Sequence, residues 1–133
     1  MSADVVYLDT SAVVKLVVRE PQTAALQHFL RSRARRVSTA LLRVELLRVA
    51  GRVPAPGIRE RALRQLANIH LIRLDPALLD AASGLQPPSL RSLDAIHLAG
   101  ALSLGANLDA LVTYDARLME AANLLGLTVS SPA

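Results

Sequence analysis

Short runs of apolar residues alternate along this chain with longer segments in which apolar residues recur at helical spacing. Runs rich in β-prone residues cover 5–8, 37–39, 69–74, 110–113 and 127–130. Segments with helical periodicity cover 12–18, 21–33, 40–52, 58–68, 76–85, 92–104 and 116–125. Because the strands are separated by helix-length segments, the pattern predicts right-handed βαβ units and an α/β fold around a parallel sheet of four to five strands.

Residues with restricted conformations mark several boundaries of these segments. Pro21 and Pro76 stand where a proline suits the first turn of a helix. Pro54, Pro56 and Gly57 are expected to end the helix 40–52. Ser11 and Ser92 are expected to cap the helices that follow them.

The overall composition limits the class of protein. With 133 residues and 14.2 kDa, the chain fits a single domain, 1–133, that can bury a core without disulfides. It contains no cysteine, which excludes disulfides, zinc–thiolate sites and thiol nucleophiles and favours a cytoplasmic location. No export signal is recognisable and no stretch approaches the ~18 apolar residues of a membrane span, so no membrane association is expected. A hydrophobic fraction of 52% with few aromatic residues predicts a protein–protein surface, either a homodimer face or a groove for a partner helix.

Basic residues are concentrated in one segment of the chain. Residues 31–64 contain ten arginines against two glutamates, a charge of +8, whereas the remainder has five basic and nine acidic residues, a charge of −4. Guanidinium groups suit phosphate backbones, so this segment favours nucleic acid as a partner. The alternative is that these arginines only form solvated helix faces.

Two of the predicted strands end in a carboxylate. Asp9 follows the first apolar run, next to Thr10 and Ser11, and Asp115 follows the fourth run, two residues after Thr113. Ligands collect at the carboxyl ends of parallel strands, so the two acids converge if the first and fourth strands are neighbours. The alternative is that each acid only caps the helix that follows it.

Two further acids lie on predicted helices with few other acidic residues. Glu45 is the sole acid of the helix 40–52, where an ion pair with Arg48 is the simplest interpretation. Asp94 and His97 lie one turn apart on a helix that is apolar nearly all round. One interpretation is that Asp94 is an acid of the first helical turn, which the helix dipole favours, and that His97 is a core residue. The other is that Asp94 stands at the mouth of a site, where His97 supports it or contacts the substrate.

Four carboxylates that converge would repel one another unless a cation neutralised them. Mg²⁺ and Mn²⁺ are hard cations that prefer oxygen ligands, so the cluster predicts a divalent-metal site. The chain has no cysteine and no evident Ser-His-Asp arrangement, so a hydrolytic reaction at this site would use a metal-activated water as the nucleophile.

The motifs taken together resemble the PIN domain, specifically the VapC-type toxin ribonucleases of type II toxin–antitoxin pairs. The residues that carry the resemblance are YLDTSA at 7–12, Glu45, SLDAIHLA at 92–99 and VTYD at 112–115. The resemblance implies a PIN-like three-layer fold, with the central parallel sheet in the order 3-2-1-4-5 and helices on both faces. It also implies an Mg²⁺- or Mn²⁺-dependent endoribonuclease that forms a homodimer and is inhibited by a cognate VapB-like antitoxin.

The resemblance also assigns roles to individual residues. The implied catalytic and metal-binding quartet is Asp9, Glu45, Asp94 and Asp115, and the implied auxiliary hydroxyls are Thr10, Ser11 and Thr113. His97 is a further auxiliary candidate, to which the resemblance assigns no role. Asp9 and Asp94 are expected to bind the ion directly. For Glu45 and Asp115 three roles stay open: they bind the ion directly, they bind it through water, or they orient the nucleophile.

Some roles are not assigned by the four acids and the hydroxyls. Arg43, Arg48 and Arg52 are candidate RNA contacts, and the role of His97 stays open. The alternative function is a catalytically inactive PIN-like module that binds RNA or an antitoxin without turnover.

Overall fold

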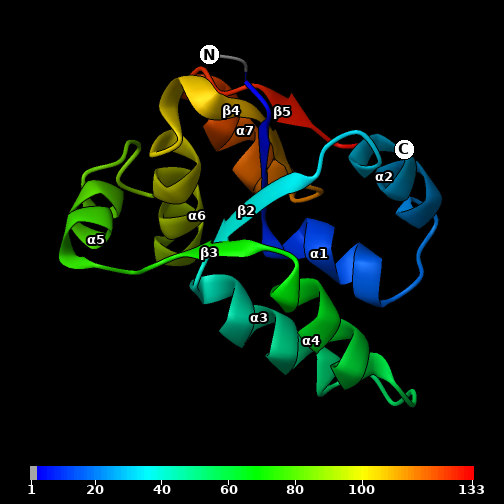
Figure 1. The fold of residues 1–133 in the computed structure, drawn as a ribbon. Coiled ribbons are helices and arrows are strands. Elements are labelled where there is room, and N and C mark those ends of the chain that lie inside the picture. Colours follow the sequence, from blue (N-terminus) through cyan, green and yellow to red (C-terminus); the bar gives the residue numbers. More distant parts are fainter. Residues whose placement is uncertain (1–2) are drawn as a thin grey trace.

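The computed structural model describes residues 3–133, and within them a five-stranded parallel sheet lies between two layers of helices (Figure 1). The strands are β1 (Val5–Leu8), β2 (Arg35–Thr39), β3 (His70–Ile72), β4 (Leu108–Val112) and β5 (Val129–Ser130). The helices are α1 (Thr10–Val17), α2 (Thr23–Leu30), α3 (Leu41–Ala50), α4 (Ile58–Ala67), α5 (Pro76–Ser83), α6 (Ser92–Leu102) and α7 (Ala116–Leu124), with a 3-10 turn at Gly105–Asn107. The α/β fold class and the strand order β3-β2-β1-β4-β5 confirm the prediction.

The central strand β1 pairs in parallel with β2 on one side and with β4 on the other. Tyr7 stands opposite Val37 of β2 and Leu111 of β4, and every residue of β1 is buried. The first and fourth strands are therefore neighbours, as convergence of the two strand-end acids requires.

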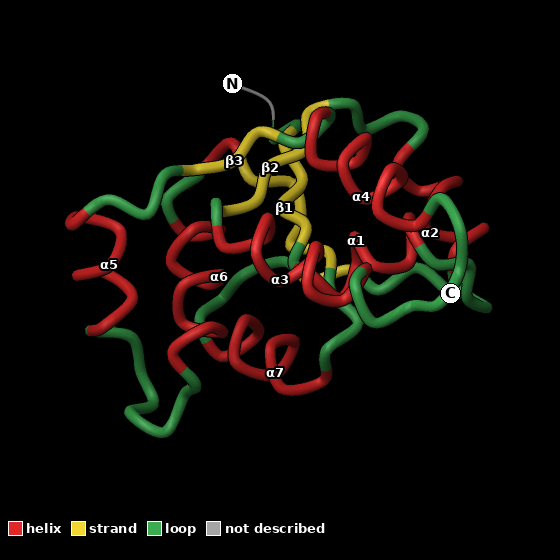
Figure 2. The backbone as a smooth tube through the Cα atoms, turned by 90° about the horizontal axis from the view of Figure 1, so that it is seen from below, coloured by secondary structure: helices red, strands yellow, loops and turns green. Residues whose placement is uncertain are grey.

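Each face of the sheet has its own hydrophobic core because successive residues of a strand point to opposite faces. Val6 and Leu8 pack in the core that α1, α2, α3 and α4 cover, whereas Val5 and Tyr7 pack in the core that α6 and α7 cover. Helix α5 packs against α6 on the second face. Figures 1 and 2 show α5 and α6 on the opposite side of the strands from α4.

Two of the predicted helix caps are wrong. Asp9, not Ser11, caps α1, because its extended backbone lets its Oδ1 accept a hydrogen bond from the N–H of Ala12 at 3.0 Å. Ser92 is the first residue of α6 rather than its cap, and Arg91 at the cap position makes no side-chain capping bond. The first helix consequently starts directly after the strand-end carboxylate.

Some elements are shorter than the sequence pattern predicts. The segment expected to be helical from Pro21 forms a turn first, and α2 begins only at Thr23, whose hydroxyl accepts a hydrogen bond from the N–H of Glu20 at 2.9 Å. The third strand is limited to His70–Ile72, at the edge of the sheet. Among residues 3–133, no helix has the length and apolar character needed to span a membrane.

Helix α6 approaches the sheet closely at Gly100. A Cβ atom at this position would lie 2.5 Å from Cγ2 of Thr39 and 3.0 Å from Cε2 of Tyr7, both shorter than a van der Waals contact. The missing side chain therefore lets α6 lie directly over β1 and β2. The same packing places His97, one turn earlier in α6, against Tyr7.

Candidate active site

The carboxylate of Asp9 is buried and held by four hydrogen-bonding contacts at the carboxyl end of β1. Ser11 Oγ lies 2.7 Å from Oδ1 and 3.0 Å from Oδ2, Thr113 Oγ1 donates to Oδ2 at 2.7 Å, and the N–H of Ala12 completes the set. Only 4% of Asp9 is exposed. Asp9 therefore does cap the following helix through Oδ1, as the alternative interpretation held. Its Oδ2 accepts a hydrogen bond from Thr113, at the end of the neighbouring strand β4.

The environment of Asp9 opposes its negative charge. Burial raises the pKa of its carboxyl, and the bonds from Thr113 and Ser11 together with the nearby His97 counteract this only in part. A buried carboxylate with a raised pKa is one that a positive charge would stabilise.

Glu45 of α3 lies in a second hydrogen-bonded group together with residues of α1 and α6. Its Oε1 atom accepts from Thr10 Oγ1 at 2.5 Å and lies 2.8 Å from Nε2 of His97, whose Nδ1 lies 2.7 Å from the phenol of Tyr7. Burial raises the pKa of Glu45, but the bonds from His97 and Thr10 and the charge of His97 outweigh it, so the pKa lies below its ordinary value. Among the described residues no ion pair joins Glu45 to Arg48.

Asp94 and Asp115 are the other two acids of the candidate site, and they influence each other through their charges. Asp115 caps α7, and its Oδ1 accepts from the N–H groups of Arg117 and Leu118 at 2.9 and 3.3 Å. Burial raises the pKa of Asp94, and the charge of Asp115 raises it further. Asp94 therefore stands in the first turn of α6 with an unfavourable neighbouring charge.

The structure joins the auxiliary hydroxyls to different acids. Ser11 and Thr113 bond Asp9, and the backbone N–H of Asp115 also donates to Thr113 Oγ1 at 3.0 Å, which links the two strand-end acids. Thr10, which the sequence associated with Asp9, instead bonds Glu45.

The oxygen ligands that these acids offer fit a hard divalent cation, although the side chains do not form a complete coordination site. Within residues 3–133, no three His, Asp or Glu side chains stand together in a way that could hold a metal ion. The acidic groups offer oxygen only, and the raised pKa values of Asp9 and Asp94 indicate that their ionised forms lack a compensating charge.

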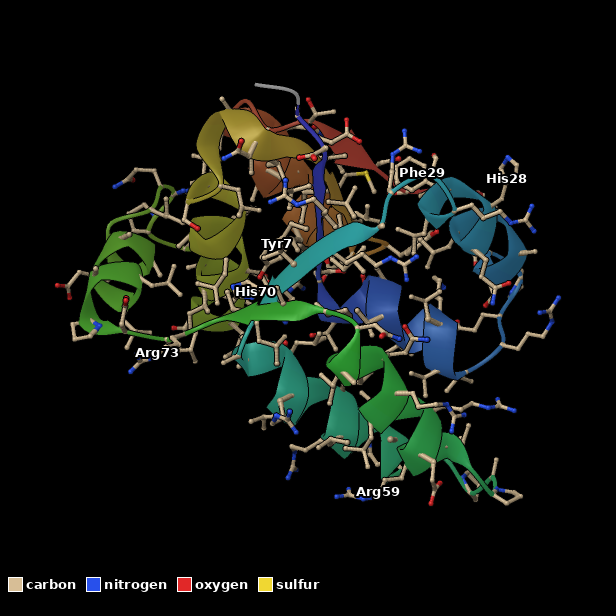
Figure 3. All side chains as sticks on the ribbon, viewed as in Figure 1. Tyr7, His28, Phe29, Arg59, His70 and Arg73 are labelled. Atoms are coloured by element: carbon tan, nitrogen blue, oxygen red, sulfur yellow. The ribbon has the colours of Figure 1, made fainter. Side chains whose placement is uncertain are left out.

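Tyr7 is the residue of this site that the sequence pattern did not single out. Its ring is fully buried, in the interior of the molecule (Figure 3), and its hydroxyl contacts Nδ1 of His97. The available signal was a phenol in an otherwise aliphatic strand, because a buried tyrosine hydroxyl needs a hydrogen-bond partner.

The three candidate RNA-contacting arginines lie on or just after the helix that carries Glu45. Arg43 and Arg48 are exposed on α3, and Arg52 is exposed two residues after the helix ends. These three residues are therefore accessible to a ligand in solution.

Comparison with protein families and curated proteins gives consistent matches over most of the chain. Residues 6–124 match the model of the PIN domain. Over 127 residues the chain is 50% identical to ribonuclease VapC46 of Mycobacterium tuberculosis, covering 96% of this chain and 97% of that protein. Ribonuclease VapC35 of the same organism is 43% identical over 131 residues, with 96% of each chain covered.

Solved structures share the fold at low sequence identity. A chain in the crystal structure of VapBC2 from Rickettsia felis, bound to a DNA fragment from the promoter, aligns with a TM-score of 0.74 and 14% identity over 97% of this chain and 99% of that one. A chain of VapBC-5 from Mycobacterium tuberculosis aligns with a TM-score of 0.61 and 20% identity over 96% of each chain.

Proposed function

Since this chain belongs to the PIN domain family and to its VapC-type proteins, we propose that it is a divalent-metal-dependent endoribonuclease and the toxin of a toxin–antitoxin pair. The observation that carries the proposal is the buried Asp9 carboxylate, fixed at the carboxyl end of the central strand. A second acid, Asp94, has its pKa raised by burial and by the charges of Asp115 and Glu45. The relatives that are 39–50% identical over most of the chain carry the name ribonuclease.

The proposed catalytic and metal-binding residues are Asp9, Glu45, Asp94 and Asp115. A bound Mg²⁺ or Mn²⁺ would polarise the phosphodiester and activate the attacking water. Asp9 makes the most hydrogen bonds of the four acids, because Ser11, Thr113 and the N–H of Ala12 hold both of its oxygens. Asp94 and Asp115 supply further negative charge, which favours cation binding.

The substrate class follows from the charges around the acids. Arg43, Arg48 and Arg52 would contact the phosphate backbone, which positions the RNA and makes its affinity fall with salt. The scarcity of aromatic residues, 2% of the chain, disfavours recognition by stacking on single-stranded bases.

The proposed partners are a VapB-like antitoxin and a second copy of this chain, and the proposed place of action is the cytoplasm. Structural neighbours in VapBC assemblies support the antitoxin. Large aliphatic side chains exposed on several helices supply apolar surface for such contacts: Val44, Leu63, Leu79, Leu93 and Leu124. Sedimentation of the purified chain as a monomer at high concentration would contradict the homodimer.

The decisive experiment compares the cleavage of RNA by three aspartate variants. We expect Asp9→Asn and Asp94→Asn to abolish Mg²⁺- or Mn²⁺-dependent cleavage while the circular dichroism spectrum stays unchanged, because asparagine keeps the shape but removes the charge. Asp80→Asn, on the exposed face of α5, is the matched control and should cleave like the wild type.

The same proteins separate the enzyme from a binding module without turnover. Saturating Mn²⁺ at about 100 times its Kd should raise the unfolding free energy of the wild type by about 2.7 kcal/mol, and much less in Asp94→Asn. Wild-type protein that binds RNA but neither Mn²⁺ nor Mg²⁺ would favour the inactive module. Cleavage that persists in Asp9→Asn would refute the assigned site.

A further inference from the structure

We propose that His97 is a positioning residue that holds Glu45 through its Nε2–H group, and that Tyr7 fixes the imidazole from its other nitrogen. The inference rests on the proposed function, because it assigns His97 a task in the same site. It also adds Tyr7, which within residues 3–133 makes no hydrogen bond to any of the four acids and instead contacts His97.

The three side chains form one continuous chain of hydrogen-bond contacts from the core to the site. The phenol oxygen of Tyr7 lies 2.7 Å from Nδ1 of His97, and Nε2 of His97 lies 2.8 Å from Oε1 of Glu45. Exposure rises along this chain: 0% for Tyr7, 4% for His97, and 24% for the side chain of Glu45. The chain therefore begins in the protein interior and ends at the surface where substrate would arrive.

The position of the imidazole proton follows from the two neighbours of the ring. A tyrosine phenol ordinarily has a pKa of about 10, so the Tyr7 hydroxyl is protonated at neutral pH and can donate to Nδ1. The Glu45 carboxylate only accepts hydrogen bonds, so Nε2 must carry a proton to bond it. A lone pair on Nε2 would instead face Oε1 at 2.8 Å, which is repulsive. Neutral and protonated His97 both satisfy this requirement at Nε2.

The bond from His97 determines which oxygen of Glu45 remains available. Thr10 Oγ1 and His97 Nε2 both bond Oε1, whereas Oε2 has no hydrogen-bond partner among residues 3–133. Fixing Oε1 from two sides restricts rotation of the carboxylate. Oε2 is thus the oxygen presented to an ion or to the attacking water.

Close packing of α6 keeps His97 at this distance from Tyr7. Gly100 lies one turn after His97, and its lack of a Cβ allows α6 to contact the Tyr7 ring, with the tyrosine and imidazole rings edge to face at a centroid distance of 5.8 Å. Glu45 comes from α3 on the other face of the sheet. His97 consequently bonds two helical layers together at the open end of the sheet.

The first test reads the imidazole directly, without metal and without substrate. ¹⁵N NMR of the metal-free protein at a pH where His97 is neutral should show Nε2 as the protonated nitrogen and Nδ1 as the hydrogen-bonded acceptor. In Tyr7→Phe, which keeps the ring, the Nδ1 resonance should move toward the value of an acceptor without a partner. A proton found on Nδ1 in the wild type would overturn the proposal.

The second test distinguishes positioning from a merely structural role. We expect His97→Ala to lower kcat for RNA cleavage by about 10- to 100-fold with little change in KM, the usual effect of removing a side chain that orients a metal ligand. His97→Gln should recover part of this loss, because its amide N–H can donate to Oε1 of Glu45. Tyr7→Phe should lower kcat for RNA cleavage by less than His97→Ala does.

The control for these variants is His70→Gln, which changes an exposed histidine on β3 (Figure 3) and should cleave like the wild type. Equal losses in His97→Gln and His97→Ala, or a change confined to KM, would overturn the proposal. Wild-type protein that cleaves no RNA would refute the proposed function instead, and the NMR experiment would still decide the inference.

Discussion

Replacing Gly100 by alanine should separate α6 from the sheet and reveal how much the site depends on this contact. The new Cβ would stand 2.5 Å from Cγ2 of Thr39 and 3.0 Å from Cε2 of Tyr7. Carbon atoms pack at about 3.5–4.0 Å, so the overlap with Thr39 is roughly 1 Å. Thr39 is a β-branched residue, fully buried within β2, and cannot move aside easily.

The magnitude follows from the cost of overpacking a well-packed core. Inserting one methyl group into such a core typically costs about 1–3 kcal/mol of unfolding free energy. The better helix propensity of alanine offsets at most about 1 kcal/mol of this cost. If α6 moves outward by roughly 1 Å, the bond from His97 to Glu45 lengthens from 2.8 Å beyond hydrogen-bond range, so cleavage should fall as well.

Urea denaturation of matched variants measures this effect. Gly51→Ala is the control: Gly51 has helical dihedral angles and its Cβ would make only ordinary contacts, 3.5 Å from the carbonyl of Leu47, so alanine should stabilise the protein by about 0.4–1 kcal/mol. Thr39→Ser removes the clashing Cγ2 and should recover stability when combined with Gly100→Ala. The reasoning is refuted if Gly100→Ala is as stable as Gly51→Ala, or if Thr39→Ser gives no recovery.

Three further predictions concern the charges and hydroxyls of the site. Burial and then the charge of Asp115 raise the native pKa of Asp94, so its ionised form costs stability above that pKa, and the cost is gone only when the pH lies below the ordinary value of 3.8. Thermal unfolding of metal-free Asp94→Asn should therefore show stabilisation at pH 7 that shrinks as the pH falls through about 4 and is lost at about pH 3, and a gain that grew as the pH fell would contradict the sign. Thr113→Val removes the donor that holds Asp9 at 2.7 Å and should lower cleavage by about 10- to 100-fold, whereas an unchanged rate would show that this bond is dispensable. Arg48→Ala should reduce the slope of log K against log salt for RNA binding by about 0.7–1, and an unchanged slope would exclude a phosphate contact.

The sequence predicted the features that depend on local pattern. Asp9 directly follows β1 and Asp115 stands three residues after the end of β4, so their place at the carboxyl edge could be inferred without coordinates. The neighbouring position of β1 and β4 came from the family resemblance, and the structure has it. The assignment of the four acids to catalysis stays a prediction.

The contacts between distant elements could not be predicted in the same way. Glu45 and His97 are 52 residues apart, and their bond depends on how α3 and α6 meet at the end of the sheet. Thr10 was expected to support Asp9 because it is adjacent in sequence, but the side chain at the first position of α1 points to α3 instead. Spacing along the chain contains no information about such crossings.

Two of the helix-capping aspartates, Asp9 and Asp75, differ in a way that bears on how the protein can lose its activity. Asp75 caps α5 from an exposed position with one bond to the N–H of Leu78, where its charge costs little. Asp9 performs the same capping task while buried, where asparagine would cap equally well without a buried charge. Folding alone thus gives no reason to prefer the acid at this position. On the proposed assignment of Asp9 to the metal site, a single change to asparagine would therefore leave a folded protein without ribonuclease activity.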